Sequence, residues 1–417
     1  MNKMNNKYIR YSKMFSSYLG ASIIPMCLNL LTNPLIARNM SPDDYAISGY
    51  YFSFSSLLSP IIVFYMIHYY IKEYYRLDEN ERIKLYAAIS KALIWFSGLI
   101  TIICFLFLLI YLKCNSSNLS LPIFPYLALT VFSLPLTGLY NLKIAEYKMK
   151  KKSQSYFVLV VGNGVLLVIL NLLFIVFLKW GAFGKLLAPF IGNLFVFSVL
   201  LYKSKQFFYF HTDTRQYAKI FKFCWPLAIS STLGYFTNGF TTTYLESIGD
   251  NYQYGLYVVA ASIGSYLTVF SSAVGNTFQP DLYEATINRH WNRWLKICLS
   301  EIAVTSLVAI LFIIVAPFVI NILTGYRYGD STPYARILAL SSITSSIYFL
   351  INSYTIATDH PKFYLYTSVL GSIAVILLMP FFVKHYSFSG GCWMSVLSFL
   401  IFALINISLL LLSYIRR

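Results

Sequence analysis

The side chains that could bind a ligand are few, because charged residues make up only 11% of the 417-residue chain and hydrophobic residues make up 58%. Among the charges, Lys143 stands out, since it follows Asn141 in an apolar segment and leads to a basic run from Lys148 to Lys152. A cation at the end of a membrane helix commonly snorkels to the interface. A cation in a polar cavity instead suits an anionic ligand that carries phosphate, and among the charges near the membrane Lys143 is the best candidate for this role.

Polar side chains gather in particular apolar segments. Asn29 and Asn33 lie one turn apart, so they share one face of a helix. Serine and threonine also hold membrane helices together, at about 0.6 kcal/mol for each contact, but that role explains single residues better than it explains their clustering. We therefore expect a water-filled cavity between two halves of the chain. The residues expected to line it are Lys143, Asn29, Asn33, Arg38, Thr237, Asn238, Asn276 and Gln279.

No pattern in the sequence is typical of a metal, nucleotide or catalytic site. The five histidines include no i, i+4 pair that would hold a metal, and the six cysteines include no C-x-x-C pair. The stretch from Gly181 to Lys185 has a shorter spacing than a phosphate loop, and no strand precedes it. We therefore predict no cofactor and no metal. A disulfide between Cys114 and Cys392 is left open.

Carboxylates are scarce in the apolar segments. Glu301 is the one that we expect within the membrane, and Lys296 is near enough in sequence to pair with it. Such a pair would neutralise the charge, so the sequence gives little support for a proton or sodium site built on a carboxylate.

The elements that must position these residues are membrane helices. A mean hydropathy of +0.64 is far above that of a soluble domain, so the chain is predicted to be an all-α integral membrane protein. Segments near the 20 residues that a bilayer requires fall at 14–37, 46–71, 87–111, 122–146, 156–178, 184–202, 223–245, 254–279, 297–320, 334–357, 363–383 and 392–414. The sequence therefore predicts about twelve transmembrane helices.

The lysines and arginines predict the orientation. With both termini in the cytoplasm, most of the 32 basic residues fall in cytoplasmic segments, as expected from the positive-inside rule. This bias and attraction to anionic lipid headgroups account for the net charge of +17, so no nucleic acid partner is predicted. The loops on the outer side are short, which weakens the interpretation of the chain as a membrane glycosyltransferase or polymerase.

The chain is predicted to contain an internal duplication. The stretch from Tyr11 to Pro60 recurs without gaps from Tyr217, and Asp44 matches Asp250. At the same offset, Gly184 matches Gly390. We therefore predict an N-terminal lobe at 1–202, a basic cytoplasmic linker at 203–222 and a C-terminal lobe at 223–417, with six helices in each lobe and both lobes oriented alike.

Several stretches resemble the polysaccharide transport family of the multidrug/oligosaccharidyl-lipid/polysaccharide exporter superfamily, specifically the bacterial O-antigen flippases. The first helix ends in PLIARNMSPDDYAISGYY, similar to the family pattern P-L-x-A-R-x-L-x-P-x-x-Y-G. Further similar stretches are FCWPLAIS with GDNYQYGLYVVA, LPLTGLYNLKIAEYKMKKKSQSY, WGAFGKLLA and FSGGCWMSV. The chain departs from the pattern at Tyr45-Ala46, and FTNGFTTTYL lacks the acidic residue that some members carry in the seventh helix.

The resemblance implies a MATE-like exporter fold with two lobes in the bacterial inner membrane. Its implied substrate is an undecaprenyl-pyrophosphate-linked oligosaccharide repeat unit of O-antigen or capsule, which crosses to the periplasmic leaflet by alternating access. An O-antigen polymerase and a chain-length regulator are implied partners. Lys143 occupies a place where the family often has a cation.

Two alternatives stay open from the residues. A multidrug exporter of the same superfamily would favour acidic residues that bind organic cations, whereas the expected cavity is basic or neutral. A membrane O-antigen polymerase would be an enzyme, and the short outer loops and the duplication argue against it.

Overall fold

The computed structural model describes residues 20–21, 23–74, 77–114, 121–204, 214–287, 289–357 and 361–415. Within these ranges the regular structure is entirely helical, which confirms the predicted all-α class. The first described helix runs over Ile23–Arg38. The helices that follow up to the 205–213 gap are α2 (Pro42–Val63), α3 (Met66–Glu73), α4 (Glu79–Cys114), α5 (Tyr126–Met149), α6 (Ser153–Asn171), the π-helix η1 (Leu172–Phe177) and α7 (Gly181–Lys203).

The remaining helices follow that gap. They are α8 (Thr214–Leu233), α9 (Tyr235–Glu246), α10 (Asn251–Ile287), α11 (Trp291–Leu323), the short 3₁₀-helix η3 (Gly329–Ser331), α12 (Thr332–Ala339), α13 (Ser341–Ala357) and α14 (Pro361–Ile415). Each of the twelve predicted spans overlaps at least one described helix. In the described part of the chain, nine helical segments are long and apolar enough to cross a membrane. The count of twelve and the cytoplasmic termini stay predictions.

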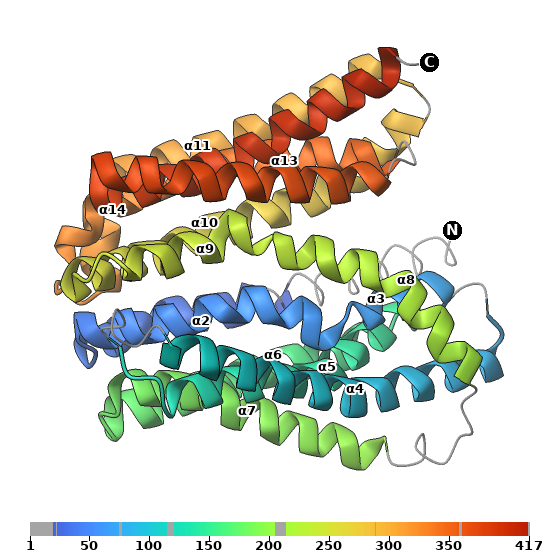
Figure 1. Ribbon diagram of the computed structural model, residues 1–417, viewed down its shortest axis with the longest axis horizontal. Coiled ribbons are helices and arrows are strands. Elements are labelled where there is room, and N and C mark those ends of the chain that lie inside the picture. The colour runs from blue at the N-terminus through green and yellow to red at the C-terminus, as the bar shows by residue number, and fades with distance from the viewer. Residues whose placement is uncertain are drawn as a thin grey trace, which may run out of the picture. The chain divides into compact units, whose positions relative to one another are not determined.

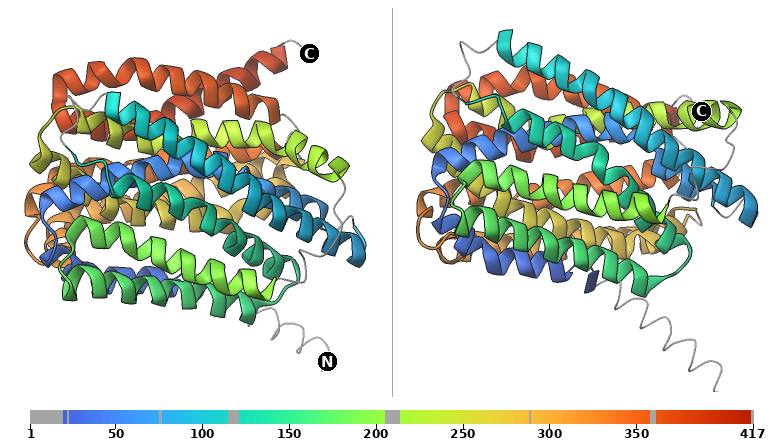
Figure 2. Two further views of the ribbon diagram at one scale, coloured as in Figure 1. Left: turned by 60° about the horizontal axis from the view of Figure 1, so that its bottom comes forward. Right: turned by 90° about the horizontal axis from the view of Figure 1, so that it is seen from below.

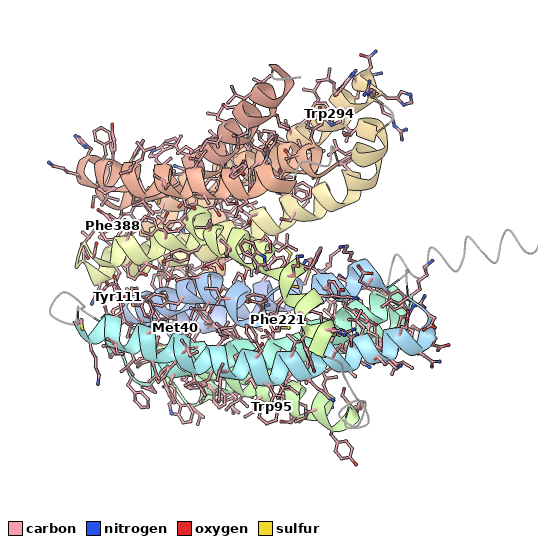
Figure 3. All side chains as sticks on the ribbon, turned by 45° about the vertical axis from the view of Figure 1, so that its right-hand side comes forward. Met40, Trp95, Tyr111, Phe221, Trp294 and Phe388 are labelled. Carbon is pink, nitrogen blue, oxygen red and sulfur yellow. The ribbon has the colours of Figure 1, made fainter. Side chains whose placement is uncertain are left out.

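The number of described spans differs from the twelve predicted ones for reasons that are local to particular helices. Leu233 and Tyr235 belong to separate helices, α8 and α9, so the predicted span at 223–245 is divided. The predicted spans at 363–383 and 392–414 both lie in α14, which contains a kink at Ser387. Large apolar side chains on the outside of the helices fit a lipid environment, because lipid solvates them. On α4, for example, Trp95 is 76% exposed and Tyr111 is 53% exposed (Figure 3).

The chain divides into two compact units. Unit 1 consists of the described residues within 1–41, 58–117 and 121–228, and unit 2 of those within 42–57 and 229–417. The predicted lobes at 1–202 and 223–417 are not tested by this division. The boundaries fall inside two helices, so that Pro42–Leu57 of α2 packs with unit 2 and Thr214–Ala228 of α8 packs with unit 1. Helix α8 contains the start of the second matching stretch of the predicted duplication, and most of α2 lies within the first.

Unit 1 is a helical bundle in which α5 contacts α4, α6 and α7 (Figure 1). The same helices run alongside one another in the two other views (Figure 2). Phe64 and Tyr65 have left-handed backbones with φ of 52° and 54°, and they separate α2 from α3. The ring of Phe64 packs against Phe96 and Phe221, at centroid distances of 5.1 and 5.3 Å. The break is therefore enclosed by aromatic side chains of α4 and α8.

Unit 2 is a second bundle, in which α14 packs against α13 and α9, and α10 packs against α11 and α13 (Figure 1). Its core includes Val375, Met379, Met394 and Phe402 of α14, so the two halves of α14 fold back on each other around the kink. Cys114 and Cys392 are both free thiols, so the disulfide that the sequence left open is absent.

Equivalent positions of the duplication adopt similar structures. Gly181 and Ser387 match at the offset of the repeat, and both have a φ of 50° at the turn between two helices. Gly49 and Gly255 also match, and each allows a close helix contact within unit 2. A Cβ at Gly255 would collide with the backbone of Pro42, and one at Gly49 would collide with Val258. The N-terminal parts of α2 and α10 therefore approach closely because both carry glycine.

Candidate functional site

Lys143 lies on α5 of unit 1 and is bound to a carboxylate. Its Nζ donates a hydrogen bond to Oε2 of Glu146 over 2.7 Å, and Nζ of Lys150 donates to Oε1 of the same residue over 2.6 Å. The spacings i, i+3 and i, i+4 place these three side chains on one face of the helix. The side chain of Glu146 is 8% exposed. Two cations thus share one buried carboxylate, and the triad retains a net charge of +1.

Tyrosine rings hold the triad in place. Nζ of Lys143 lies 5.7 Å from the ring centroid of Tyr86 on α4 and 5.1 Å from that of Tyr147 on α5. Tyr86 packs edge-on against Tyr70 of α3, with their centroids 5.8 Å apart. A lysine within about 6 Å of an aromatic face is attracted by the ring quadrupole. Helices α3, α4 and α5 therefore each contribute to the position of Lys143.

A small cavity of about 90 Å³ lies beside the triad. It has room for several water molecules or one phosphoryl group. Nε of Arg82 is buried and has no hydrogen-bond partner among the described residues, and the guanidinium lies 4.6 Å from the ring centroid of Tyr74. An arginine with an unused donor suits a phosphate oxygen. The cavity is lined by Tyr70, Tyr74, Glu79, Arg82, Ile83, Tyr86, Glu146 and Lys150.

The helix Ile23–Arg38 carries three of the predicted cavity residues. Asn29 and Arg38 are exposed and Asn33 is half-buried. This helix packs against α6, because Gly164 allows Pro25 to approach it closely. Asn29, Asn33 and Arg38 lie on a different helix from the triad, and their place in a shared cavity stays a prediction.

The predicted cavity residues of unit 2 are described only in part. Thr237 is buried, its Oγ1 donates to the carbonyl oxygen of Gly234 over 2.7 Å, and its own carbonyl accepts from Ser398 over 3.1 Å. It thus contributes to the contact between α9 and α14. The side chains of Asn238, Asn276 and Gln279 lie outside the described part of the structure.

Much of the polarity in unit 2 connects helices. Ser53 of α2 is hydrogen-bonded to Thr243 of α9 over 2.8 Å. Oγ1 of Thr355 donates to Oδ1 of Asn406 over 2.8 Å, and Ser271 donates to the carbonyl of Ser342 over 3.0 Å. Such bonds satisfy polar groups that lipid could not satisfy. The alternative role considered for serine and threonine, that of holding helices together, therefore accounts for these residues.

One face of α10 keeps exposed hydroxyl groups. Ser262, Ser265 and Ser272 are exposed, and each donates to a backbone carbonyl of the preceding turn. Because their spacing follows the helical period, they form a stripe. These three side chains are accessible to a ligand or to water.

The expected pair between Glu301 and Lys296 is wrong. Glu301 is 1% exposed, and its Oε1 has no hydrogen-bond partner among the described residues, whereas Lys296 is exposed. Positions i and i+5 are about 140° apart around a helix, so the two side chains point in different directions. Glu301 instead faces α10, where a Cβ at Gly275 would lie 3.1 Å from Oε1. Among the described residues, no cation contacts Oε1 of this buried carboxyl.

Sequence reasoning did not place Glu146, Lys150 or Arg82 in the candidate site. The spacing of Lys143, Glu146 and Lys150 could have identified the triad, because it matches the i, i+3 and i, i+4 rule. Arg82 has no comparable signal, since its proximity to Lys150 depends on how α4 packs against α5. The basic cluster is therefore larger than the single lysine that the sequence indicated.

The family model described as "Polysaccharide biosynthesis protein" matches residues 12–280, more than half of the chain. No curated protein matches. Among solved structures, the chain is similar to an inward-facing multidrug resistance MATE family transporter of the MOP superfamily, with a TM-score of 0.71 and 13% identity over 95% of this chain and 98% of that one. It is also similar to the lipid II flippase MurJ in an inward closed conformation, with a TM-score of 0.72 and 14% identity over 95% and 87% of the two chains.

A third similar structure is a MOP superfamily transporter from Pyrococcus furiosus, whose binding pocket is described as having reverse polarity. Its TM-score is 0.64 and its identity 14%, over 97% of this chain and 95% of that one. At these identities the similarity shows the fold alone. The predicted MATE-like exporter fold of a multi-pass membrane protein is thereby confirmed.

Proposed function

Because the chain belongs to the family of polysaccharide biosynthesis proteins, whose model matches residues 12–280, we propose that it is a flippase for a lipid-linked oligosaccharide. Its substrate is an undecaprenyl-pyrophosphate-linked repeat unit of O-antigen or capsule, carried from the cytoplasmic to the periplasmic leaflet of the bacterial inner membrane. The chain acts as a transporter and not as an enzyme. A polymerase and a chain-length regulator act on the units that it delivers.

The observation that supports this function most directly is the basic cluster of unit 1. Arg82 and Lys150 line a cavity that can hold one phosphoryl group, together with the carboxylates of Glu79 and Glu146. Lys143 is joined to this lining through its hydrogen bond to Glu146. The cluster lies at the end of the helices where the basic run from Lys148 to Lys152 predicts the cytoplasm. A pyrophosphate arriving from the cytoplasmic leaflet would meet these cations first. We propose that Arg82 binds it in the cavity, and that Lys143, held beside the cavity by Glu146, adds positive charge there.

The fold alone does not distinguish a flippase from a drug exporter, because both a multidrug transporter and a lipid II flippase are among the similar structures. The charge does favour the flippase. An exporter of organic cations would need carboxylates that are free to bind them. Of the two carboxylates that line this cavity, Glu146 is bound to two lysines and Glu79 is exposed. The surplus charge of the cluster is positive and suits an anion.

Transport by alternating access requires a contact that closes one side and can separate. At Gly255 of α10 the backbone of Pro42 approaches so closely that a Cβ would collide with it. Pro42–Leu57 belongs to the predicted N-terminal lobe, yet it packs within unit 2. We propose that this contact closes the periplasmic side in the present state and opens when the transporter faces outward.

The function is tested in a strain from which the gene is deleted. Lipid-linked intermediates are fractionated, and their leaflet is determined with a membrane-impermeant glycan-modifying reagent. We expect complete repeat units to accumulate on the cytoplasmic side, and the wild-type chain to relieve this while Arg82→Ala does not. Single unpolymerised units on the outer side would show that the chain is a polymerase, and unchanged intermediates with a loss of drug resistance would show that it is a drug exporter.

A further inference from the structure

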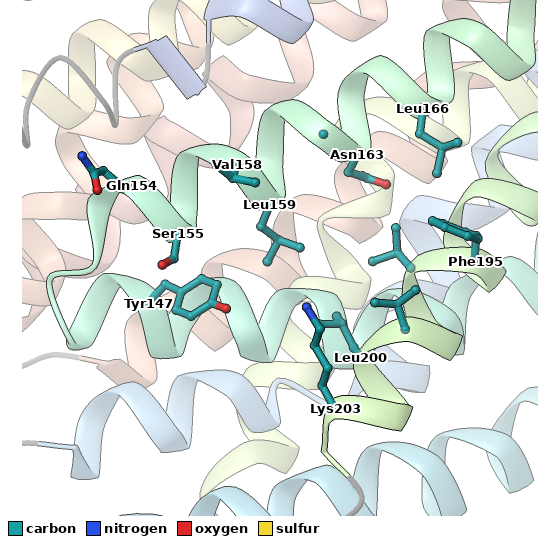
Figure 4. Close-up of a pocket in the computed structure, with 13 residues that line it drawn as sticks. Tyr147, Gln154, Ser155, Val158, Leu159, Asn163, Leu166, Phe195, Leu200 and Lys203 are labelled. Carbon is teal, nitrogen blue, oxygen red and sulfur yellow. The ribbon is translucent and has the colours of Figure 1, made fainter.

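Unit 1 carries a second, larger cavity, which lies between α6 and α7 and ends at Tyr147 of α5 (Figure 4). Its volume is about 610 Å³. Val158 on one wall is 70% exposed and Phe195 on the other is 59% exposed, so the cavity is a groove that is open along its length. Because both walls belong to apolar spans, an occupant would enter from the lipid.

The two ends of the groove differ in polarity. One end has the ammonium of Lys203, the hydroxyl of Tyr147 and the side chains of Gln154 and Ser155 (Figure 4). No carboxylate is present among the described residues that line the groove. This end therefore offers one positive charge and several hydrogen-bonding groups, which suits a phosphodiester with neighbouring hydroxyl or ester oxygens.

The rest of the groove is apolar apart from Asn163, with walls that include Val158, Leu159, Val196 and Val199. At Gly162 no atom lies within 4 Å of the place where a Cβ would stand, so the groove is open at this point of α6. From Ser155 to Leu166 the helix rises about 16 Å at 1.5 Å per residue. This length is about half of the 30 Å hydrocarbon core, that is, one leaflet.

We propose that this groove binds an anionic glycerophospholipid of the leaflet on the basic side of the membrane. The phosphate lies against Lys203 and Tyr147, and one acyl chain follows α6 towards Leu166. A polyprenyl chain is several times longer than the groove, which favours a phospholipid over the carrier lipid as the occupant. The inference does not depend on the transport function.

The groove also adjoins the basic cluster. Tyr147 lines the groove, and the same ring lies 5.1 Å from Nζ of Lys143. A phosphate bound to the Tyr147 hydroxyl would therefore add negative charge close to Lys143. A lipid bound in the groove would therefore change the electrostatic environment of Lys143, with Tyr147 lying between the two.

The test uses the purified full-length chain in detergent, titrated with phosphatidylglycerol or with phosphatidylcholine of the same acyl chains. Bound lipid is counted by native mass spectrometry, and thermal stability is measured in parallel. We expect phosphatidylglycerol to bind more tightly than phosphatidylcholine. Lys203→Ala should weaken its binding about fivefold, the effect of one lysine near an anionic surface, whereas Lys219→Ala, another exposed lysine of unit 1, should leave it unchanged.

A Cβ at Gly162 would meet no atom within 4 Å, so the Gly162→Leu variant should fold normally. Its side chain extends into the groove, so the variant should lose the bound phosphatidylglycerol. Equal binding of the two phospholipids, or wild-type binding in a stably folded Gly162→Leu variant, would overturn the proposal. Undecaprenyl phosphate that displaces phosphatidylglycerol in the wild type, but not in Gly162→Leu, would identify the carrier lipid as the occupant and would also overturn it.

Discussion

The ammonium of Lys143 donates a hydrogen bond to the carboxylate of Glu146 over 2.7 Å, and this carboxylate has a second lysine, Lys150, at 2.6 Å. This bond changes the role expected of Lys143. Its positive charge is partly neutralised by Glu146, so Lys143 is not an isolated cation. A ligand phosphate must compete with Glu146 for Lys143, so binding and release can both be fast. This exchange suits a transporter, which must let its substrate go.

Glu146→Gln should lower the stability of the protein, since it leaves two lysines without their shared carboxylate. Removing one partner of a fully buried ion pair costs about 3–5 kcal/mol. Lys150 is 43% exposed, so we expect a smaller cost of about 1–3 kcal/mol. The measurement is thermal unfolding of the purified variant. Glu81→Gln, at the exposed start of α4, is the matched control and should cost no more than about 0.3–1 kcal/mol, the effect of one charge in the first turn of a helix. Equal melting temperatures of the two variants would contradict the structural role of the triad.

Lys143→Ala should reduce surface polysaccharide at least severalfold while protein levels stay normal, because Lys150 continues to bind Glu146. The double variant Lys143→Ala with Glu146→Gln separates two roles of the lysine. If Lys143 binds pyrophosphate, the second change should not restore the polysaccharide. If Lys143 only neutralises Glu146, the double variant should recover the wild-type amount of surface polysaccharide. Lys84→Ala, an exposed lysine of α4, is the control. Wild-type polysaccharide in Lys143→Ala would refute a role in transport.

The sequence predicted where the helices lie better than it predicted where they are interrupted. Each described α-helix overlaps a predicted apolar run, because a bilayer demands about 20 apolar residues for each crossing. The break between α2 and α3 had no such signal, since Phe64 and Tyr65 are neither glycine nor proline and are held by rings from other helices. Similarly, α8 begins at Thr214 within the predicted linker, because its first turns are polar.

The candidate site was predictable only where its residues are neighbours in sequence. The Lys143–Glu146 bond follows from helical spacing, and the error at Glu301 follows from ignoring that spacing. Arg82 reaches the same cavity as Lys150 through helix packing, which a single sequence does not reveal. The burial of Thr237 likewise depends on α14, which lies far along the chain.

Gly255→Ala should destabilise the protein, because the new Cβ would meet the backbone of Pro42, which cannot move aside as a side chain can. Overpacking of this kind costs about 1–3 kcal/mol. Gly49→Ala should cost less, since its Cβ would meet only the side chain of Val258. At Gly98 a new Cβ would have no atom within 4 Å, so Gly98→Ala is the control. Its stability should be unchanged or raised, because alanine favours a helix more than glycine does. Equal melting temperatures for the three variants would show that α2 and α10 do not approach so closely.

Reporter fusions test the predicted orientation. A fusion after Leu77, between α3 and α4, should report the cytoplasm, and a fusion after Gly249, between α9 and α10, should report the periplasm. The reason is the excess of lysine and arginine on the side of Leu77. A phosphatase that is active only in the periplasm and a fluorescent protein that matures only in the cytoplasm give complementary signals. The opposite pattern at either site would refute the topology and the assignment of the basic cluster to the cytoplasmic side.

Glu301→Gln should leave stability unchanged or raise it. Oε1 of Glu301 is buried without a hydrogen-bond partner among the described residues, and an unpaired carboxylate is costly to bury. Glutamine keeps the shape of the side chain and removes the charge, so the cost falls while the packing beside Gly275 is preserved. Glu301→Ala is the control for shape, and the cavity that it leaves should lower the melting temperature. A melting temperature for Glu301→Gln as low as that of Glu301→Ala would show that the carboxylate itself stabilises the fold, and a cation bound to it would then have to be sought.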